Sequence, residues 1–239
     1  MKYLGIILIS LTLSFPCLAK KTRNKVSTKT KTSKSSVQLK PVVGTLFNNI
    51  RFNNGSGSGI DMKVAPGISV GLGLIVPTGR YFSLESGLFY SVNNLQYDLK
   101  TNGQNFSDDF DVEFYLQRIS IPLLARIHPW TRGNGFYVKT GFMNHIQLSS
   151  HVDVNGTSTE TVNQTSTTSN FSADGPIGYG EGMRPINIDA VLGGGYDFKI
   201  SRNFSMQAEL GYQLGLLGFD IDGDDNIVDT FFLNLGFGF

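Results

Sequence analysis

The sequence predicts an all-β chain that folds as an eight-stranded antiparallel up-and-down transmembrane β-barrel. Apolar residues alternate with small or polar residues along eight segments, and short connections between these segments alternate with long ones. After the first residues, no stretch of about 18 apolar residues could form a spanning helix. The 28 Gly, 18 Phe and 9 Tyr of the composition also favour β structure.

Residues 1–19 have the features of a secretory signal peptide: a charged start, a short apolar run and a small residue, Ala19, before the expected cleavage. The alternative is a lipoprotein signal in which Cys17 is acylated, but Phe15 and Pro16 are not the small residues that such a signal carries. Cys17 is the single cysteine. A chain cleaved after Ala19 would therefore have no disulfide and no thiolate metal site.

Residues 20–38 are predicted to be a basic, disordered periplasmic leader. Eight basic residues and no acid lie between Lys20 and Lys40, and all 19 carboxylates follow residue 60. Residues 41–239 have 11 basic residues against these 19 acids, so their net charge is −8. The leader is either a flexible segment or a tether to an anionic surface such as phospholipid or cell-wall polymer. The barrel domain follows over residues 39–239.

The connections predict the orientation of the barrel. They are short after the second, fourth and sixth segments and long after the others, and residues 150–185 are the longest, either mobile or a recognition surface. Short turns in the periplasm and long loops outside the cell are typical of outer membrane barrels, and an even strand number places both termini in the periplasm. The expected strands are 39–49, 63–76, 81–96, 113–128, 136–149, 186–200, 203–217 and 230–239.

The two faces of each segment distinguish a membrane barrel from a soluble, lipocalin-like barrel. The polar faces are rich in glycine and have few, balanced charges, which suits a small crowded lumen. Aromatic residues cluster near strand ends, as they do at membrane interfaces. In the last segment Phe231, Leu233 and Leu235 would face lipid, and this segment is expected to pair with residues 39–49 and close the barrel.

Charged residues on the inward faces are equally divided between acids and bases. Because a buried charge costs several kcal/mol unless it is paired, we expect an ion-pair network that fills the lumen and leaves no solute pore. A gated or proton-relaying interior is the alternative. The expected members are Glu85, Arg118, Arg126, Lys139, Asp189, Asp197, Lys199 and Glu209.

Two acidic segments are candidate cation sites. The loop with Asp220, Asp222, Asp224 and Asp225 resembles a divalent cation loop, because hard cations bind clustered oxygen ligands. It lacks the glycine and glutamate spacing of an EF-hand, so a solvated acidic loop is favoured. The same interpretation applies to the loop that contains Asp108, Asp109 and Asp111. We expect no metal and no cofactor.

The three histidines give little support for an enzyme. His128 lies at a strand end and His151 begins the longest loop. His145 faces inward near the outer rim, but Ser149 on the same strand would be about 13 Å away, beyond hydrogen-bond reach. Cross-strand partners remain open. Nucleic acid is not an expected partner, since the basic run lacks interleaved aromatic residues.

Three stretches carry a resemblance to a known family: residues 115–126 with their core Ile121-Pro122-Leu123-Leu124, the run Gly193-Gly194-Gly195-Tyr196, and the closing residues 235–239. They resemble the PorT-like outer-membrane β-barrel family over roughly residues 40–239. The resemblance implies an eight-stranded barrel of the OmpA/OmpX type in a Gram-negative outer membrane, among lipid and lipopolysaccharide. It also implies insertion by the barrel-assembly machinery, with Phe239 as the recognition signal.

The expected function is that of an integral outer membrane protein with a filled, non-conducting lumen, which has a structural or interaction role through its surface loops. Envelope proteins are the expected partners. Because the named member of the family belongs to a protein-secretion apparatus, the first alternative is a subunit of a secretion or surface-assembly complex. A lipid-modifying enzyme that uses His145 and a narrow channel are the remaining alternatives.

Overall fold

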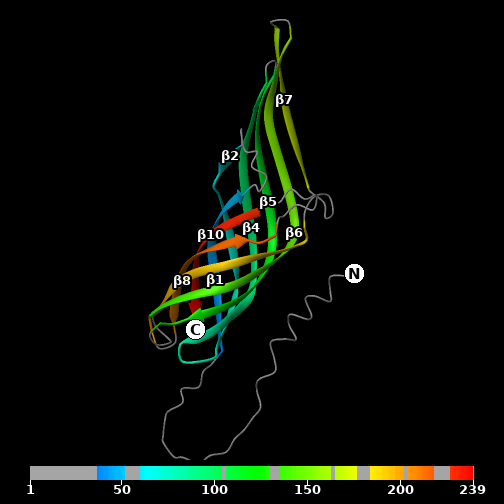
Figure 1. Cartoon of the computed structure of the whole chain (residues 1–239). Helices are drawn as coiled ribbons and strands as arrows, with labels where there is room; N and C mark the ends of the chain where they lie inside the picture. The colour runs from blue at the N-terminus through cyan, green and yellow to red at the C-terminus, as the bar shows by residue number, and fades with distance from the viewer. Residues whose placement is uncertain are drawn as a thin grey trace, which may run out of the picture. The chain divides into compact units, whose positions relative to one another are not determined.

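The computed structural model describes residues 37–51, 60–103, 106–129, 135–162, 165–176, 184–201, 204–217 and 227–238. They lie in one compact unit, Ser35–Phe239. Alternating side chains form ten β-strands, drawn in Figure 1. These are β1 (Gln38–Arg51), β2 (Ile60–Lys63), β3 (Ala65–Pro77), β4 (Phe82–Asn102), β5 (Phe106–Ile127), β6 (Gly135–Val162), β7 (Thr165–Pro176), β8 (Ile186–Lys199), β9 (Ser205–Gly215) and β10 (Ile227–Gly238).

Eight of these strands form a closed antiparallel ring in the order β1-β3-β4-β5-β6-β8-β9-β10, and β10 pairs with β1. The closing pairs include Val43 with Leu235 and Phe47 with Phe231. The prediction of an eight-stranded transmembrane barrel closed between the first and last strands is therefore confirmed. No helix among the described residues is long and apolar enough to cross a membrane.

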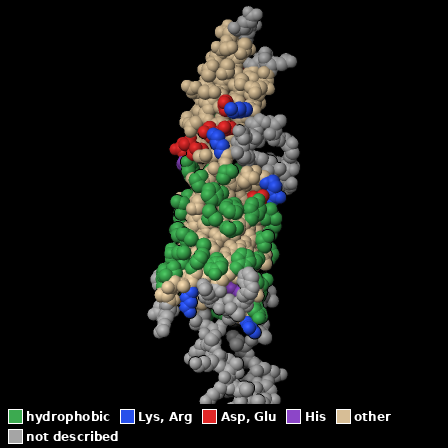
Figure 2. Space-filling view, turned by 90° about the vertical axis from the view of Figure 1, so that its left-hand side faces the viewer, with side chains coloured by type: hydrophobic (Ala, Val, Ile, Leu, Met, Phe, Trp, Pro, Cys, Tyr) green, Lys and Arg blue, Asp and Glu red, His purple; other side chains and the backbone are tan. Residues whose placement is uncertain are grey.

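The apolar rows face outward from the barrel. Ile68, Leu72 and Leu210 have exposed fractions of 62%, 49% and 56%, whereas the glycines and polar residues between them are largely buried. Figure 2 shows the exposed hydrophobic side chains as a belt on one face, with charged side chains beyond it at both ends. An outward apolar band of this kind is typical of a membrane barrel.

Several strands are much longer than the membrane requires. β4 has 21 residues, β5 has 22 and β6 has 28, whereas about 9–11 residues suffice to cross the hydrocarbon core. Their outer ends continue as a sheet beyond the ring, with β2 added to β4 and β7 added to β6 (Figure 1). We call this extension the outer sheet: β2, β7 and the parts of β4, β5 and β6 with residues 94–102, 106–117 and 149–162.

The outer sheet corrects two expectations. The strands predicted to cover 81–96, 113–128 and 136–149 are longer, and much of the supposed loop 150–185 is the β6–β7 hairpin. Asp108, Asp109 and Asp111 consequently lie on β5 and not in a loop. The physical reason is that the outward face of these segments meets water and not lipid, so they lack the outward apolar row that marks a membrane strand.

Two positions of β6 depart from regular strand geometry: a glycine with positive φ and a β-bulge. Gly141 has a φ of +152°, and a Cβ there would lie 2.2 Å from the carbonyl oxygen of Leu123 on β5, so only glycine fits without strain. Further along, the register between β5 and β6 shifts between Gln117 and Arg118, where Leu148 is the extra residue of a β-bulge. The bulge marks the passage from barrel to outer sheet.

Candidate functional site

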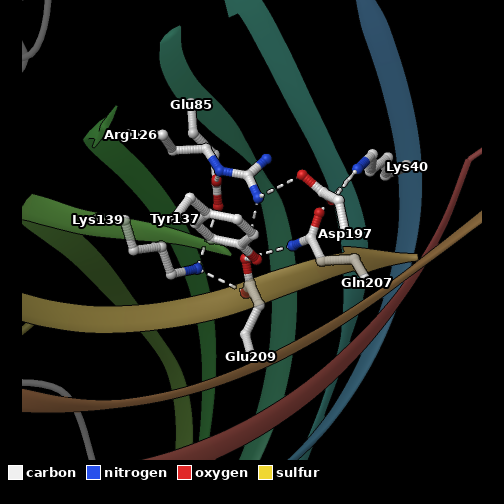
Figure 3. A network of polar contacts seen from close by, with 8 residues as sticks. All are labelled: Lys40, Glu85, Arg126, Tyr137, Lys139, Asp197, Gln207 and Glu209. Carbon is white, nitrogen blue, oxygen red and sulfur yellow. Dashed lines mark hydrogen bonds and ion pairs between the residues drawn. The ribbon is translucent and has the colours of Figure 1, made fainter. Parts of the chain in front are cut away.

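The periplasmic half of the lumen is filled by one group of polar side chains, shown in Figure 3, which we call the basal network. Because alternate residues of each strand face inward, six different strands contribute to it. The structure brings together Lys40, Glu85, Arg126, Tyr137, Lys139, Asp197, Gln207 and Glu209.

Arg126 lies at the centre of the basal network, and its side chain is 1% exposed. Its Nε is 3.2 Å from Glu85 Oε2, and its Nη2 is 3.7 Å from Asp197 Oδ2 and 3.8 Å from Glu209 Oε1. The guanidinium carbon also lies 3.6 Å from the centre of the Tyr137 ring. One cation therefore contacts three carboxylates and an aromatic face, which offsets the cost of its burial.

Two lysines complete the charge balance. Lys139 Nζ is 2.6 Å from Glu209 Oε2 and 3.3 Å from Glu85 Oε1. Lys40 Nζ donates to Asp197 Oδ1 at 2.9 Å and to Gln207 Oε1 at 2.9 Å. The network thus pairs three cations with three carboxylates among the described residues. Such a balanced set can remain charged inside a narrow barrel.

Neutral groups of the basal network donate further hydrogen bonds to Glu209. The Tyr137 hydroxyl donates a hydrogen bond of 2.5 Å to Glu209 Oε1, and the Gln207 amide donates to the same oxygen. Glu209 consequently receives contacts from Lys139, Tyr137 and Gln207. This arrangement can block the lumen.

A second polar group lies nearer the outer end of the lumen, where β5, β6 and β8 are adjacent. His145 Nδ1 is 2.7 Å from Ser120 Oγ, and His145 Nε2 is 2.9 Å from Asp189 Oδ2. All three side chains are buried. Ser149 on the same strand was expected to lie out of reach and cross-strand partners were left open; the partners of His145 lie on the neighbouring strands β5 and β8.

The chain Ser120–His145–Asp189 has the order of contacts that activates a serine nucleophile. The cavity beside it has a volume of about 40 Å³ and is lined by Ser120 and His145, among other residues. A lipid or ester substrate would need far more space, as ligand pockets usually measure about 300 Å³ or more. The geometry fits a hydrogen-bonded link between three strands.

Seven of the eight residues expected in the lumen network have buried side chains. Glu85, Arg126, Lys139, Asp197 and Glu209 meet in the basal network, whereas Arg118 and Asp189 lie in the outer half of the lumen. Lys199 differs from these seven, because it is exposed at the end of β8.

Sequence reasoning missed Lys40, Tyr137 and Gln207. Lys40 ended the basic run and was counted with it, although it shares its inward face with Val42 and Leu46 on β1. That alternation could have identified it. Tyr137 is fully buried, and it was missed because aromatic residues near strand ends were expected to face lipid.

The outer sheet has a different electrostatic character. Its exposed or half-exposed charged side chains are mainly acidic, and Lys63 and Lys100 form ion pairs among them, with Lys63 Nζ 2.7 Å from Asp98 Oδ1. The hydrogen bond from Lys63 lowers the pKa of Asp98 below its ordinary value. The acids include Asp98, Asp108, Asp109, Asp111, Glu113, Asp153, Glu160 and Asp174.

Several expected features lie outside the described residues: the signal peptide 1–19 with Cys17, most of the leader 20–38, the acidic loop with Asp220, Asp222, Asp224 and Asp225, and Phe239. Within the described part of the chain, no three His, Cys, Asp or Glu side chains are arranged to hold a metal ion.

Comparison with solved structures finds several similar chains of low sequence identity. Ail of Yersinia pestis is 11% identical, with 84% of this chain and 98% of Ail covered and a TM-score of 0.31. Neisserial surface protein A is 11% identical, with 85% and 97% covered and a TM-score of 0.35. CarO of Acinetobacter baumannii is 12% identical, with 83% and 97% covered and a TM-score of 0.36.

Comparison with curated protein sequences found no match. The family model described as "Outer membrane protein beta-barrel domain" matches residues 23–219, which is most of the chain. The closed ring of strands, with its lipid-facing belt and polar lumen, agrees with that match. The chain therefore belongs to the family of outer membrane protein β-barrel domains, and it is an integral protein of the bacterial outer membrane.

Proposed function

We propose that the protein has a filled, non-conducting lumen and acts through the outer sheet, as an interaction protein of the cell surface. The observation that carries this proposal is the free edge of β7. Among the described residues, β7 pairs with β6 alone, over Thr165–Pro176, so its other edge offers backbone N–H and C=O groups. A partner strand can add to such an edge by β-augmentation.

The composition of β7 supports this role. Natural proteins usually protect edge strands with lysines, inward charges, bulges or prolines. The twelve residues of β7 contain no Lys or Arg, and their one proline, Pro176, is the last residue. A row of cross-strand hydroxyl contacts, such as Thr159 with Thr168 at 3.1 Å and Thr161 with Ser166 at 2.9 Å, keeps the hairpin regular.

The basal network supports the non-conducting part of the proposal. Arg126 and its carboxylate partners are buried together in the lumen, and an ion that passes there would have to break buried ion pairs. We infer no catalytic role, because the cavity beside Ser120 is too small for a lipid substrate. Planar-bilayer recordings should show no discrete conductance steps. Regular single-channel steps would reject this part of the proposal.

The interaction role is tested by site-specific photocrosslinking in intact cells. With a photoreactive side chain at Ser169 on β7, we expect one discrete crosslinked adduct with a partner protein. Its yield should fall when a strand-forming segment of the partner is added. The matched control carries the same group at Ser201, at the opposite end of the barrel, and should give no such adduct. Equal patterns at both positions, or none at Ser169, would contradict the proposal.

We also propose that the chain is PorT-like. In that case the protein would be a subunit of a secretion or surface-assembly complex. Its support is the resemblance of residues 115–126, which lie on β5, the strand that runs from the lumen into the outer sheet. Mild-detergent purification should then retain an envelope partner at constant stoichiometry. A protein that purifies alone under all such conditions would remove this version.

We further propose that residues 1–19 are a cleaved signal peptide, that residues 20–38 are a periplasmic leader, and that Phe239 is read by the barrel-assembly machinery. N-terminal sequencing of the mature protein should begin at Lys20. Deletion of residues 20–38 should leave folding intact and weaken retention on isolated cell wall. A mature protein that begins at an acylated Cys17 would show a lipoprotein signal in place of a signal peptide cleaved after Ala19.

A further inference from the structure

Arg118 is a buried cation with a different environment from that of Arg126. Its exposed fraction is 4%, and its Nε donates to Gln147 Oε1 at 3.1 Å. A guanidinium has five N–H donors. Within the described part of the chain no carboxylate forms an ion pair with Arg118. A buried charge without a counter-charge costs several kcal/mol, so this one calls for an anion.

The Arg118 side chain lines the cavity of about 40 Å³ in the outer half of the lumen. Polar side chains from several strands line it too, including Ser91, Asn93, Ser120 and His145. A cavity needs about 10–15 Å³ for each water molecule. This one has room for about three water molecules, or for one group of the size of a carboxylate or a phosphate.

The neighbouring carboxylates are already engaged. Glu85 and Glu209 also line the cavity, but Lys139 and Arg126 hold them in the basal network. Asp189 contacts His145 Nε2. Among the described charged groups of the lumen, Arg118 is thus the cation that lacks a contact with an acid, and a bound anion would supply it.

The local backbone geometry near Arg118 is irregular. The β-bulge at Leu148 lies beside it, and as a result Gln147 and Ser150 both face the lumen, although strict alternation would separate them. Bulges often re-aim side chains at functional sites. Gln147 accepts a hydrogen bond from Nε. A guanidinium can also bind an oxyanion through two parallel hydrogen bonds.

Apolar side chains enclose the site on both sides along the barrel axis. Leu46, Leu124, Val191 and Phe232 pack together toward the basal network, and the cluster of Ile50, Leu95, Leu116 and Val228 follows at the outer end. An enclosed, apolar surrounding strengthens a charge-assisted hydrogen bond and excludes large ligands. The small cavity is therefore not a site for a lipid or a sugar.

From these observations we propose that the lumen contains a binding site for a small oxyanion of the carboxylate or phosphate class, held by Arg118. This site is independent of the interaction role proposed for the outer sheet. The site binds one anion per chain and stabilises the folded barrel by mass action.

The test uses the full chain folded in detergent micelles. Thermal unfolding is followed at constant ionic strength in formate, acetate, phosphate or chloride. We expect the unfolding midpoint of the unaltered chain to rise with the logarithm of formate, acetate or phosphate concentration, and chloride to have no such effect. The carboxylate and phosphate arms distinguish the two sources of the oxyanion.

Two variants locate the effect. Arg118→Gln should abolish the rise, whereas Arg51→Gln, which alters a half-exposed arginine already paired with Asp229, should preserve it. Titration calorimetry of the unaltered chain gives a second readout if Arg118→Gln does not fold, with one saturable oxyanion site expected. No saturable binding, binding of chloride alone, or an equal midpoint rise in Arg118→Gln would overturn the proposal.

Discussion

The two halves of β4, β5 and β6 place apolar residues on opposite faces. In the barrel half, Leu84 and Leu88 of β4 point outward and Glu85 points into the lumen. In the outer sheet the relation is reversed: Leu95 is 2% exposed on the inner face, while Asp98 and Lys100 of the same strand form ion pairs on the other. The backbone continues from one half to the other, so the difference reflects the surroundings, lipid in one half and water in the other.

This comparison explains which side chains carry the energy in each half. The barrel must satisfy its buried charges internally, because lipid lies outside, and it does so through compact multi-contact ion pairs. The outer sheet can leave its charges to water, so each of its ion pairs contributes little. Substitutions of similar chemistry should therefore have very different effects in the two halves.

The largest effect is expected at Arg126. In Arg126→Gln, Glu85, Asp197 and Glu209 each lose a cationic contact in a buried site. Removal of one partner from a buried ion pair costs about 3–5 kcal/mol. The free energy of unfolding in urea, measured in detergent micelles, should fall by that amount. Arg51→Gln is the control, with a loss of at most about 1 kcal/mol since its side chain is 48% exposed. Equal losses would contradict the buried network.

A charge placed on the lipid-facing surface should have the next largest effect. Leu210 points outward from β9 with an exposed fraction of 56%. Leu210→Arg should destabilise the barrel in a lipid bilayer by about 2–4 kcal/mol, because arginine is costly near the midplane. The matched change Thr157→Arg on the outer sheet should alter stability by no more than about 0.5 kcal/mol. Urea unfolding in lipid vesicles measures both changes. An unchanged unfolding free energy in Leu210→Arg would show that this face of the barrel does not contact lipid.

Gly141 gives a smaller effect that depends on local geometry. Alanine there would meet the Leu123 carbonyl oxygen and a φ of +152°, at a cost of about 1–3 kcal/mol. Gly175 in the outer sheet has open space around its Cβ position, so Gly175→Ala should change the unfolding free energy little. The unfolding midpoints of the two variants provide the comparison. A tolerated Gly141→Ala would show that β5 and β6 are farther apart here.

The smallest effect concerns pH. Because Lys63 lowers the pKa of Asp98, this carboxylate stabilises the folded state above its ordinary pKa, and the contribution is lost as the pH falls through the lowered value. NMR titration should place the Asp98 midpoint below the ordinary value. It should rise in Lys63→Gln and rise less in Lys100→Gln. An unchanged midpoint in Lys63→Gln would show that the ion pair does not persist in solution.

The sequence was most informative where lipid imposes strict alternation. The strands of the barrel, its closure between β1 and β10, and the inward position of Glu85 and Glu209 follow from period-two patterns alone. Lys199 was misplaced because alternation does not reveal where a strand leaves the lumen.

The outer sheet and the cross-strand contacts could not be predicted in the same way. Polar strands such as β7 have no apolar face to mark them, and their hydrogen-bonded register appears only in three dimensions. The contact of His145 with Ser120 and Asp189 depends on strand stagger, which the spacing along one strand does not contain. Register, more than composition, determines these sites.

The most direct test of the central claim, that the same strands lie in lipid in one half and in water outside the cell in the other, is cysteine labelling in intact cells. Cys17 is the only cysteine of the chain, so single replacements on a Cys17→Ser background report separately. A membrane-impermeant maleimide should label Thr157→Cys at once. In intact cells it should not label Phe142→Cys, on the lipid-facing part of β6, or Thr78→Cys, in a periplasmic turn. After lysis Thr78→Cys alone should become reactive. Equal labelling of all three positions in intact cells, or protection of Thr157→Cys, would contradict the account.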